Sequence, residues 1–384
     1  MSMEFEGRTM RPEINLLLTL SRLSLSTTQV EHCRTILRNY QEVFDWGFFI
    51  DQASRHRVLP LIGRNISRNR LHYNPEGVPL IPYRWLFESV HYANTKRNEA
   101  LSVEFGEFFS ELNGTGIPYA VRKGPVLAET LYGDPGLRRM YDLDVLVSKE
   151  HLADIARILE QRGYARGRVS ADGTTVEPFT RGTRVFWRMH VSNELPYVRI
   201  SEDPAADVFV VDVCLDLFQK NADGRLTVAD VLDRRTPVRL CGEQSFALDL
   251  PDRFIDLCLH FRKEATARYY IESGVDLQIL KFLDVALSCE FITAAEAWPA
   301  VRERVVAGGV ADTVYFGMHH AALLYPEAVP PDALAALRPA DCGFLDEYGA
   351  VDGSVGKWRE SFVDRLFARD RKGAVQGVST VPRV

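Results

Sequence analysis

The sequence predicts an α+β fold, in which a small mixed sheet lies between two helical regions. Apolar side chains recur at three- and four-residue spacing, the pattern of amphipathic helices, over about residues 14–112 and again from about residue 251. Between these stretches lie short runs rich in apolar and β-branched residues, such as "YDLDVLV" and "DVFVVDVCLDLF", which are typical of strands.

This pattern divides the chain into four regions. We expect an N-terminal helical region, an α/β core, a C-terminal helical region and a C-terminal extension, over residues 1–113, 114–245, 246–338 and 339–384. The first region ends in a long helix that stops at "NGTG". The extension is more polar than the helices before it, and we expect it to pack loosely as a tail.

The core is expected to alternate strands and helices. "IPYAVRK" predicts a strand, "GPVLAETLY" a short helix, "YDLDVLV" a second strand and "KEHLADIARILEQRGY" an amphipathic helix. "TRVFWRMHV" predicts a further strand with Trp187 in the core, and "DVFVVDVCLDLF" follows it. In this last strand Asp212, Cys214 and Asp216 share one face, because side chains alternate along a strand.

Composition narrows the class of protein. The 384 residues are 46% hydrophobic and 26% charged, as in ordinary soluble globular proteins. The net charge of -6 argues against a nucleic-acid partner, since such proteins usually have a basic balance. No apolar run approaches the length of a membrane span, and the six cysteines contain no CxxC motif. We therefore expect a cytoplasmic protein with reduced thiols and no membrane partner.

Asp142 and Asp144 are the unusual feature of the core. They stand at the start of an apolar strand and, two residues apart, point to the same face, so their carboxylates would repel each other and be costly to desolvate. Bound Mg²⁺ would remove this cost, because this cation prefers oxygen ligands such as carboxylates. A third carboxylate from a neighbouring strand would complete a two-metal site, and Asp212 is the candidate.

Phosphate-binding groups are expected close to these aspartates. Lys123 and Gly124 form a turn before a short helix, where backbone N–H groups suit a triphosphate. Arg138 and Arg139 precede the aspartates and could also reach phosphate oxygens.

Each of these residues also has an ordinary structural explanation. Asp142 would then cap a turn, Asp144 would pair with an arginine, Lys123 would be solvated, and Arg138 and Arg139 would form a surface pair. The order of the elements favours the functional interpretation, because a Gly turn, an Asp-x-Asp strand and a later acidic strand occur in the order that a nucleotidyl-transfer core requires.

The stretch "RKGPVLAETLYGDPGLRRMYDLDVLV" resembles the signature of a little-characterised bacterial nucleotidyltransferase family within the polymerase-β-like superfamily. The resemblance extends to "DWGFFIDQASRHRVLPLI", "LPDRFIDLCLHFRKE" and "LQILKFLDVAL", with His260 and Asp284 at corresponding places, and covers roughly residues 14–330. It implies that Asp142 and Asp144 are metal ligands, that Asp212 is the third carboxylate, and that the Lys-Gly turn binds phosphate.

Two departures from the family pattern stand out. The superfamily usually has a Gly-Ser pair where this chain has Lys123 and Gly124, so no serine hydroxyl is available there for the triphosphate. The family often has a His two residues after the third carboxylate, where this chain has Cys214, which we expect to be a small buried packing residue.

Together these features predict a Mg²⁺-dependent nucleotidyltransferase. It would move NMP from an NTP, with ATP as the expected donor, to a small-molecule or peptide acceptor and release pyrophosphate. Asp142, Asp144 and Asp212 would be its catalytic residues. The alternative is a non-catalytic nucleotide-binding or scaffold protein on the same fold, which the Lys-Gly turn and Cys214 leave open.

Overall fold

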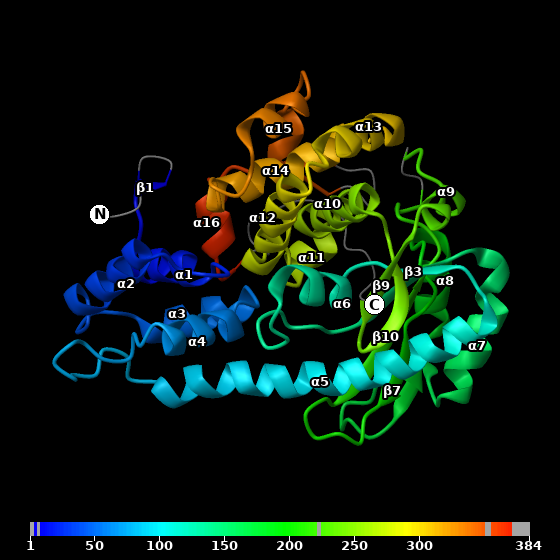
Figure 1. Cartoon of the computed structure of the whole chain (residues 1–384), viewed down its shortest axis with the longest axis horizontal. Helices are drawn as coiled ribbons and strands as arrows, with labels where there is room; N and C mark the ends of the chain where they lie inside the picture. The colour runs from blue at the N-terminus through cyan, green and yellow to red at the C-terminus, as the bar shows by residue number, and fades with distance from the viewer. Residues whose placement is uncertain (1–3, 6–7, 221–223, 350–354, 371–384) are drawn as a thin grey trace.

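The computed structural model describes residues 4–5, 8–220, 224–349 and 355–370. One eight-stranded mixed sheet lies on the right in Figure 1, and helices from both ends of the chain pack together on the left and above it. This arrangement confirms the predicted fold class, a mixed sheet flanked by helical regions. No helix among the described residues is long and apolar enough to cross a membrane.

The N-terminal part is helical, as predicted. After the short strands β1 (Glu4–Phe5) and β2 (Arg8–Thr9), it consists of α1 (Pro12–Leu20), α2 (Thr27–Asn39), α3 (Trp46–Arg55), α4 (Leu59–Arg68) and α5 (Arg84–Thr115). The start of α2 is a capping box, in which the Ser26 hydroxyl accepts a hydrogen bond from the Gln29 N–H and the Gln29 side chain accepts one from the Ser26 N–H. The long helix α5 runs across the bottom of Figure 1 from the N-terminal helices to the sheet.

The sheet has the strand order β6-β5-β7-β8-β4-β3-β10-β9. Its strands are β3 (Tyr119–Val121), β4 (Leu143–Val147), β5 (Ala165–Val169), β6 (Val176–Pro178), β7 (Tyr197–Ile200), β8 (Val208–Cys214), β9 (Thr236–Leu240) and β10 (Glu243–Ala247). The central strands β4 and β8 are parallel, whereas β3 is antiparallel to β4 and β7 is antiparallel to β8. The helical segments inserted between the strands are α6 (Gly124–Leu127), η1 (Ala128–Tyr132), η2 (Lys149–His151), α7 (Leu152–Gln161), α8 (Arg181–His190) and α9 (Val228–Asp233).

The C-terminal part is again helical. It contains α10 (Leu250–Thr266), α11 (Arg268–Glu272), α12 (Ile279–Ala294), α13 (Trp298–Gly308), α14 (Ala311–Leu324), α15 (Pro331–Ala336), η3 (Gly343–Asp346), β11 (Glu347–Tyr348), β12 (Gly356–Lys357) and α16 (Phe362–Phe367). The loose tail expected after residue 338 is therefore wrong for its described part, because Phe362, Leu366 and Phe367 are buried in the core of the helices. The end of the expected tail, residues 371–384, lies outside the described residues.

The two faces of the sheet enter different hydrophobic cores. On one face the odd-numbered residues of β4 and β8 pack under α5 and α7, in a core that includes Phe105, Phe109, Leu159, Val145 and Val211. On the other face Leu146 and Cys214 join a larger core, to which both the N-terminal and the C-terminal helices contribute. The alternation of side chains predicted for the "VVDVC" strand is confirmed, and Cys214 is a buried packing residue as expected.

Two local predictions are wrong. The segment "TRVFWRMHV" is helix α8 instead of a strand, because the Thr180 hydroxyl accepts a hydrogen bond from the Thr183 N–H and caps the first turn. Its Trp187 is half-buried and belongs to neither of the two main cores. In addition β8 ends at Cys214, so Asp216 lies beyond the strand, where its carboxylate accepts a hydrogen bond from the Phe218 N–H.

Alanine substitutions at two glycines of α5 should change the stability of the protein in opposite directions. At Gly106 an added Cβ would lie 2.5 Å from the backbone oxygen of Cys241, where α5 crosses the turn between β9 and β10, whereas nothing lies within 4 Å at Gly114. We expect Gly106→Ala to lower the free energy of unfolding by about 1–3 kcal/mol through overpacking. Gly114→Ala should raise it by about 0.5 kcal/mol, since alanine favours the helix. Urea unfolding tests this, and equal midpoints for the two variants would contradict the close approach.

Candidate functional site

The structure brings Asp142, Asp144 and Asp212 together. The strands β4 and β8 are parallel neighbours, and Asp144 lies directly opposite Asp212 in their register. Asp142 stands one residue before β4, and its carboxylate and that of Asp144 both act electrostatically on Asp212. Like charges directly opposite each other destabilise a sheet, so this arrangement needs compensation from outside the strands.

The three carboxylates have different electrostatic environments. Burial and the neighbouring carboxylates raise the pKa of Asp212 to about 8, and burial with Asp144 raises the pKa of Asp142. Burial also opposes the charge of Asp144, but Lys123 and Arg122 outweigh it and hold the pKa of Asp144 below its usual value. Oδ1 of Asp212 is buried and has no hydrogen-bond partner in the described part of the chain. A bound cation would compensate both the repulsion and this orphaned oxygen.

Lys123 lies against the aspartates. Its Nζ is 3.1 Å from Oδ2 of Asp144 and 3.0 Å from Nδ1 of His260 in α10, so it is neither solvated nor remote from the site. Gly124 follows with φ of +28°, and a Cβ there would lie 3.1 Å from the backbone oxygen of Asp142. Glycine is thus required where the Lys-Gly turn approaches the Asp-x-Asp segment closely.

Arg122, directly before this turn, fixes it to the helical part. Its Nε lies 3.1 Å from both carboxylate oxygens of Asp256 in α10, and both side chains are buried. Its Nη1 also donates to the backbone oxygen of Asp216, just after β8. This one guanidinium therefore connects the end of β3, the segment after β8 and α10.

The two predicted arginines occupy different places. Arg138 forms two hydrogen bonds of 2.9 Å to Asp284 of α12, and the Tyr132 hydroxyl donates to the same carboxylate at 2.7 Å. Arg138 is therefore held in a largely buried ion pair, not a surface pair. The guanidinium carbon of Arg139 lies 5.1 Å from the ring centroid of Tyr141, one residue before Asp142, and Arg139 makes no ion pair with any described residue.

Sequence reasoning missed several cations near the aspartates. Lys263 of α10 and Lys281 of α12 both interact electrostatically with Lys123, and they act on Asp144 and Asp142 respectively. Burial and Lys123 lower the pKa of Lys263 to about 8, and burial with Lys123 lowers the pKa of Lys281 well below its usual range. Arg57, in the turn between α3 and α4, stacks on Tyr141 at 4.2 Å from its ring centroid. Lys263 acts on Asp144, whereas Lys281 and Arg57 act on Asp142.

A chain of polar contacts links the lysines. Nε2 of His260 lies 2.8 Å from Glu264, which also forms an ion pair with Lys281, so Lys123 and Lys281 are connected through His260 and Glu264. Burial and Lys123 lower the pKa of His260 well below its usual value, so the ring is neutral between the two lysines. The i,i+4 spacing of His260 and Glu264 was visible in the sequence, but their lysine partners lie more than a hundred residues apart along the chain.

The donor set fits a hard divalent cation. Asp142, Asp144 and Asp212 supply carboxylate oxygens alone, and one oxygen of Asp212 is buried without a partner in the described chain. Among the described residues, however, no three His, Cys, Asp or Glu side chains already have the geometry of a metal site. The Lys123 ammonium rests on Asp144 and would have to share that carboxylate with the metal.

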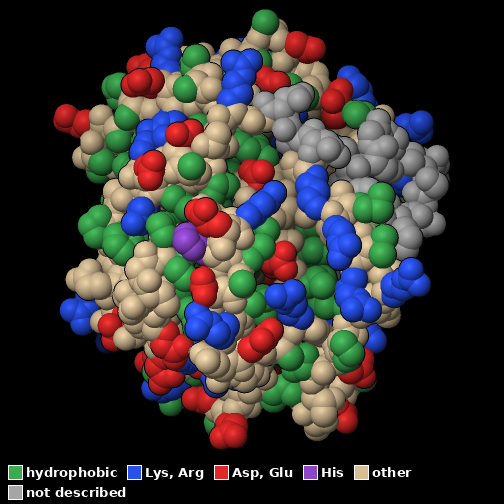
Figure 2. Space-filling view, turned by 90° about the vertical axis from the view of Figure 1, so that its right-hand side faces the viewer, with side chains coloured by type: hydrophobic (Ala, Val, Ile, Leu, Met, Phe, Trp, Pro, Cys, Tyr) green, Lys and Arg blue, Asp and Glu red, His purple; other side chains and the backbone are tan. Residues whose placement is uncertain are grey.

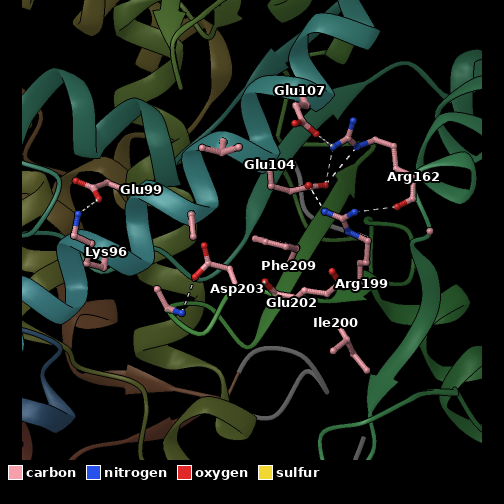
Figure 3. A pocket seen from close by; sticks show the side chains of 15 residues that line it. Lys96, Glu99, Glu104, Glu107, Arg162, Arg199, Ile200, Glu202, Asp203 and Phe209 are labelled. Atoms are coloured by element: carbon pink, nitrogen blue, oxygen red, sulfur yellow. Dashed lines mark hydrogen bonds and ion pairs between the residues drawn. The ribbon is translucent and has the colours of Figure 1, made fainter.

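A cavity of about 740 Å³ lies elsewhere, between α5 and the β7–β8 hairpin (Figure 3). Its charged side chains largely neutralise one another: Arg162 is bound by Glu104 and Glu107, and Arg199 also pairs with Glu104. None of the three aspartates lines this cavity, and its remaining carboxylates, Glu202 among them, would repel a phosphate. The cavity is therefore not the candidate site.

The mixed sheet, with three carboxylates on neighbouring strands and a Lys-Gly turn beside them, is the arrangement expected of a nucleotidyltransferase-like protein. The chain belongs to the uncharacterised nucleotidyltransferase family, whose family model matches residues 42–326. This confirms the family resemblance found in the sequence.

Comparisons with individual proteins add little to this assignment. The comparison with curated proteins gives no match. Among solved structures, the chain is similar to an antigenic nucleotidyltransferase-like protein from Paracoccidioides brasiliensis, with 13% identity over 63% of this chain and 93% of that chain and a TM-score of 0.30. At this TM-score the likeness supports no conclusion about the fold or the chemistry.

Asp212→Asn is expected to stabilise the metal-free protein at pH 8. An aspartate with a folded pKa of about 8 keeps its proton longer than the unfolded chain does, so the free energy of unfolding falls as the pH rises from about 4 to about 8. The neutral amide of asparagine avoids this loss. We therefore expect the free energy of unfolding of the variant to exceed that of wild type by about 1–3 kcal/mol in EDTA at pH 8.

The gain should shrink at pH 5, where both side chains are neutral in the folded protein. Urea unfolding at the two pH values measures it, with the exposed Asp233→Asn in α9 as a control expected to change stability by less than about 0.5 kcal/mol. A variant less stable than wild type at pH 8 would show that Asp212 is not a buried, poorly compensated carboxylate.

Proposed function

We propose that the protein is a Mg²⁺-dependent nucleotidyltransferase that moves NMP from an NTP, ATP being the first to test, to a small-molecule or peptide acceptor. Membership of the nucleotidyltransferase family supports the general activity. The observation that carries the proposal for this chain is the pairing of Asp144 with Asp212 in register, with Asp142 beside them and basic side chains acting on all three. Three carboxylates held together by such cations suit a metal-bound triphosphate better than any purely structural role.

Each residue of the candidate site would have its own role in binding metal or triphosphate. Asp142, Asp144 and Asp212 would hold Mg²⁺, which when bound would neutralise the charge that develops on the transferred phosphoryl group. Lys123, freed from Asp144, and Lys263 would bind the triphosphate oxygens. Further positive charge would come from Lys281, Arg57 and Arg139, and the Gly124 amide would donate to phosphate, as the Lys-Gly turn in the sequence suggests.

The reaction would be an in-line displacement at the α-phosphorus. The acceptor group attacks this phosphorus, the bond to the bridging oxygen of the β-phosphate breaks, and pyrophosphate leaves with the electron pair. Once a bound cation keeps Asp212 deprotonated, this carboxylate would help to take the acceptor's proton, since one of its oxygens has no partner within the described chain. Preorganised cations around the leaving pyrophosphate would lower the barrier because they need no reorganisation as charge develops.

In this proposal Arg138 is a positioning residue. Its ion pair with Asp284 and the Tyr132 hydrogen bond tie the segment before the Asp-x-Asp strand to α12. α12 also carries Lys281, so the same contact sets the distance between this lysine and the aspartates. Direct binding of phosphate by Arg138, as expected from the sequence, would have to use the edge of the guanidinium that Asp284 leaves open.

Calorimetric titration of ATP, GTP, CTP and UTP, with and without Mg²⁺, tests the donor site. We expect one nucleotide to bind in a Mg²⁺-dependent way, and this binding to be lost in Asp142→Asn/Asp144→Asn because the metal ligands are gone. The control Asp233→Asn should bind as wild type does. Binding that is independent of Mg²⁺ and survives in the double variant would favour the non-catalytic nucleotide-binding alternative.

Lys263→Gln is expected to weaken binding of the Mg²⁺-nucleotide by about tenfold, since one partly buried charge contact with phosphate is lost. The exposed Lys149→Gln, at the start of η2, removes the same charge away from the aspartates and should leave the affinity unchanged. Equal affinities for the two variants would place the triphosphate away from α10.

A further inference from the structure

Helix α8 presents an unusual exposed face. Arg181, Arg184, Val185, Arg188 and Met189 follow the spacing i, i+3, i+4, i+7, i+8, which puts them on one side of the helix. All five are exposed, and Val185 and Met189 keep 50% and 61% of their surface accessible. We call these five residues the α8 face.

The arginines of the α8 face lack counter-charges. None of the three forms an ion pair with any residue that the structure describes, although ion pairs are frequent elsewhere on the surface, as between Arg157 and Asp154. The face contains no acidic residue, so it carries three positive charges on a chain whose net charge is -6. Figure 2 views the molecule from the side on which α7, α8 and α9 lie, and Lys and Arg side chains gather there around a hollow.

The opposite side of α8 faces the protein. Phe186 and Trp187 are half-buried there, and the Trp187 indole N–H donates to the backbone oxygen of Asn193 at 2.8 Å. A short helix usually owes its stability to a buried apolar stripe. Exposed apolar residues bordered by charged ones instead mark an interaction surface.

The position of α8 connects it to the candidate site. The segment after the helix runs beside the end of β8: Asn193 is bridged to Cys214, and the Glu194 N–H donates to the Val213 oxygen at 2.9 Å. Cys214 is two residues beyond Asp212, and its Sγ lies 3.7 Å from Oδ1 of Asp144. The chain that leaves the C-terminal end of α8 therefore runs beside the strand that carries Asp212.

We propose that the α8 face binds an acidic polypeptide segment, with its carboxylates on Arg181, Arg184 and Arg188 and an apolar side chain between Val185 and Met189. The charges favour an anionic partner, and the exposed apolar pair favours a polypeptide over a nucleic acid, whose backbone offers phosphates and no apolar anchor. The net negative charge of the chain further disfavours a long polyanion. We further infer that this segment carries the acceptor group, an inference that rests on the proposed function. The docking surface itself does not depend on that function.

Selection of random 12-residue peptides on the wild-type protein, followed by fluorescence anisotropy with the recovered peptides, tests this surface. We expect recovered sequences enriched in Asp and Glu together with Leu, Ile or Phe. Their affinity should fall at least about tenfold in Arg181→Gln/Arg184→Gln/Arg188→Gln, because three charge contacts are lost while glutamine preserves the helix. Val185→Ser/Met189→Ser should also weaken them.

A matched variant removes three exposed arginines from other elements and should bind the peptides as wild type does: Arg157→Gln/Arg302→Gln/Arg338→Gln. The Asp142→Asn/Asp144→Asn protein should also retain peptide binding, which separates failure of this proposal from failure of the proposed function. The proposal is overturned if no acidic peptide is enriched, or if both triple variants bind equally. It is also overturned if a 12-nucleotide uridine RNA binds more tightly than the peptides through the same arginines.

Discussion

The structure depends on one unfavourable contact, the placement of Asp144 opposite Asp212 on adjacent parallel strands. Two carboxylates on adjacent strands, one buried and one half-buried, cannot both remain charged without compensation, and the protein compensates them differently. Asp144 keeps its charge because the Lys123 ammonium lies against it, whereas the pKa of Asp212 rises to about 8, so it holds a proton near neutral pH. The pair is therefore asymmetric before any metal or nucleotide arrives.

The sheet alone could not supply the surrounding positive charge. Lys263 and Lys281 come from α10 and α12, so these helices have to be held at a fixed position against the strands. Two buried ion pairs do this, Arg122 with Asp256 and Arg138 with Asp284, and each joins a segment next to the strands to one of the helices. Loss of one partner from such a pair typically costs about 3–5 kcal/mol, so the geometry of the site is strongly coupled to the packing of the helices.

Local patterns in the sequence were enough for the helices, most strands and the Asp-x-Asp motif, because periodicity and turn residues act over short distances. They failed at "TRVFWRMHV", where aromatic and β-branched residues favour a strand but the cap at Thr180 begins a helix. They also missed Lys263 and Lys281, since nothing near either lysine in the sequence indicates that it lies close to the Asp-x-Asp segment. The ion pair of Arg138 with Asp284 could not be predicted either, because the two residues lie far apart in the sequence. Asp284 itself had been noted in the family resemblance.

The larger hydrophobic core has a consequence for how the chain is made. Apolar residues of α1 to α4, such as Leu16 and Phe49, share this core with residues of α10 to α14 and α16, such as Phe282 and Leu366. Contacts between the two ends of a chain form late, because the intervening segment must first be closed into a loop. During synthesis the first helices leave the ribosome some 200 residues ahead of their partners, so their apolar surface stays uncovered for tens of seconds at the usual rate of about 5–20 residues per second. The apolar faces of the N-terminal helices are therefore the surface most exposed to aggregation until the last helices emerge.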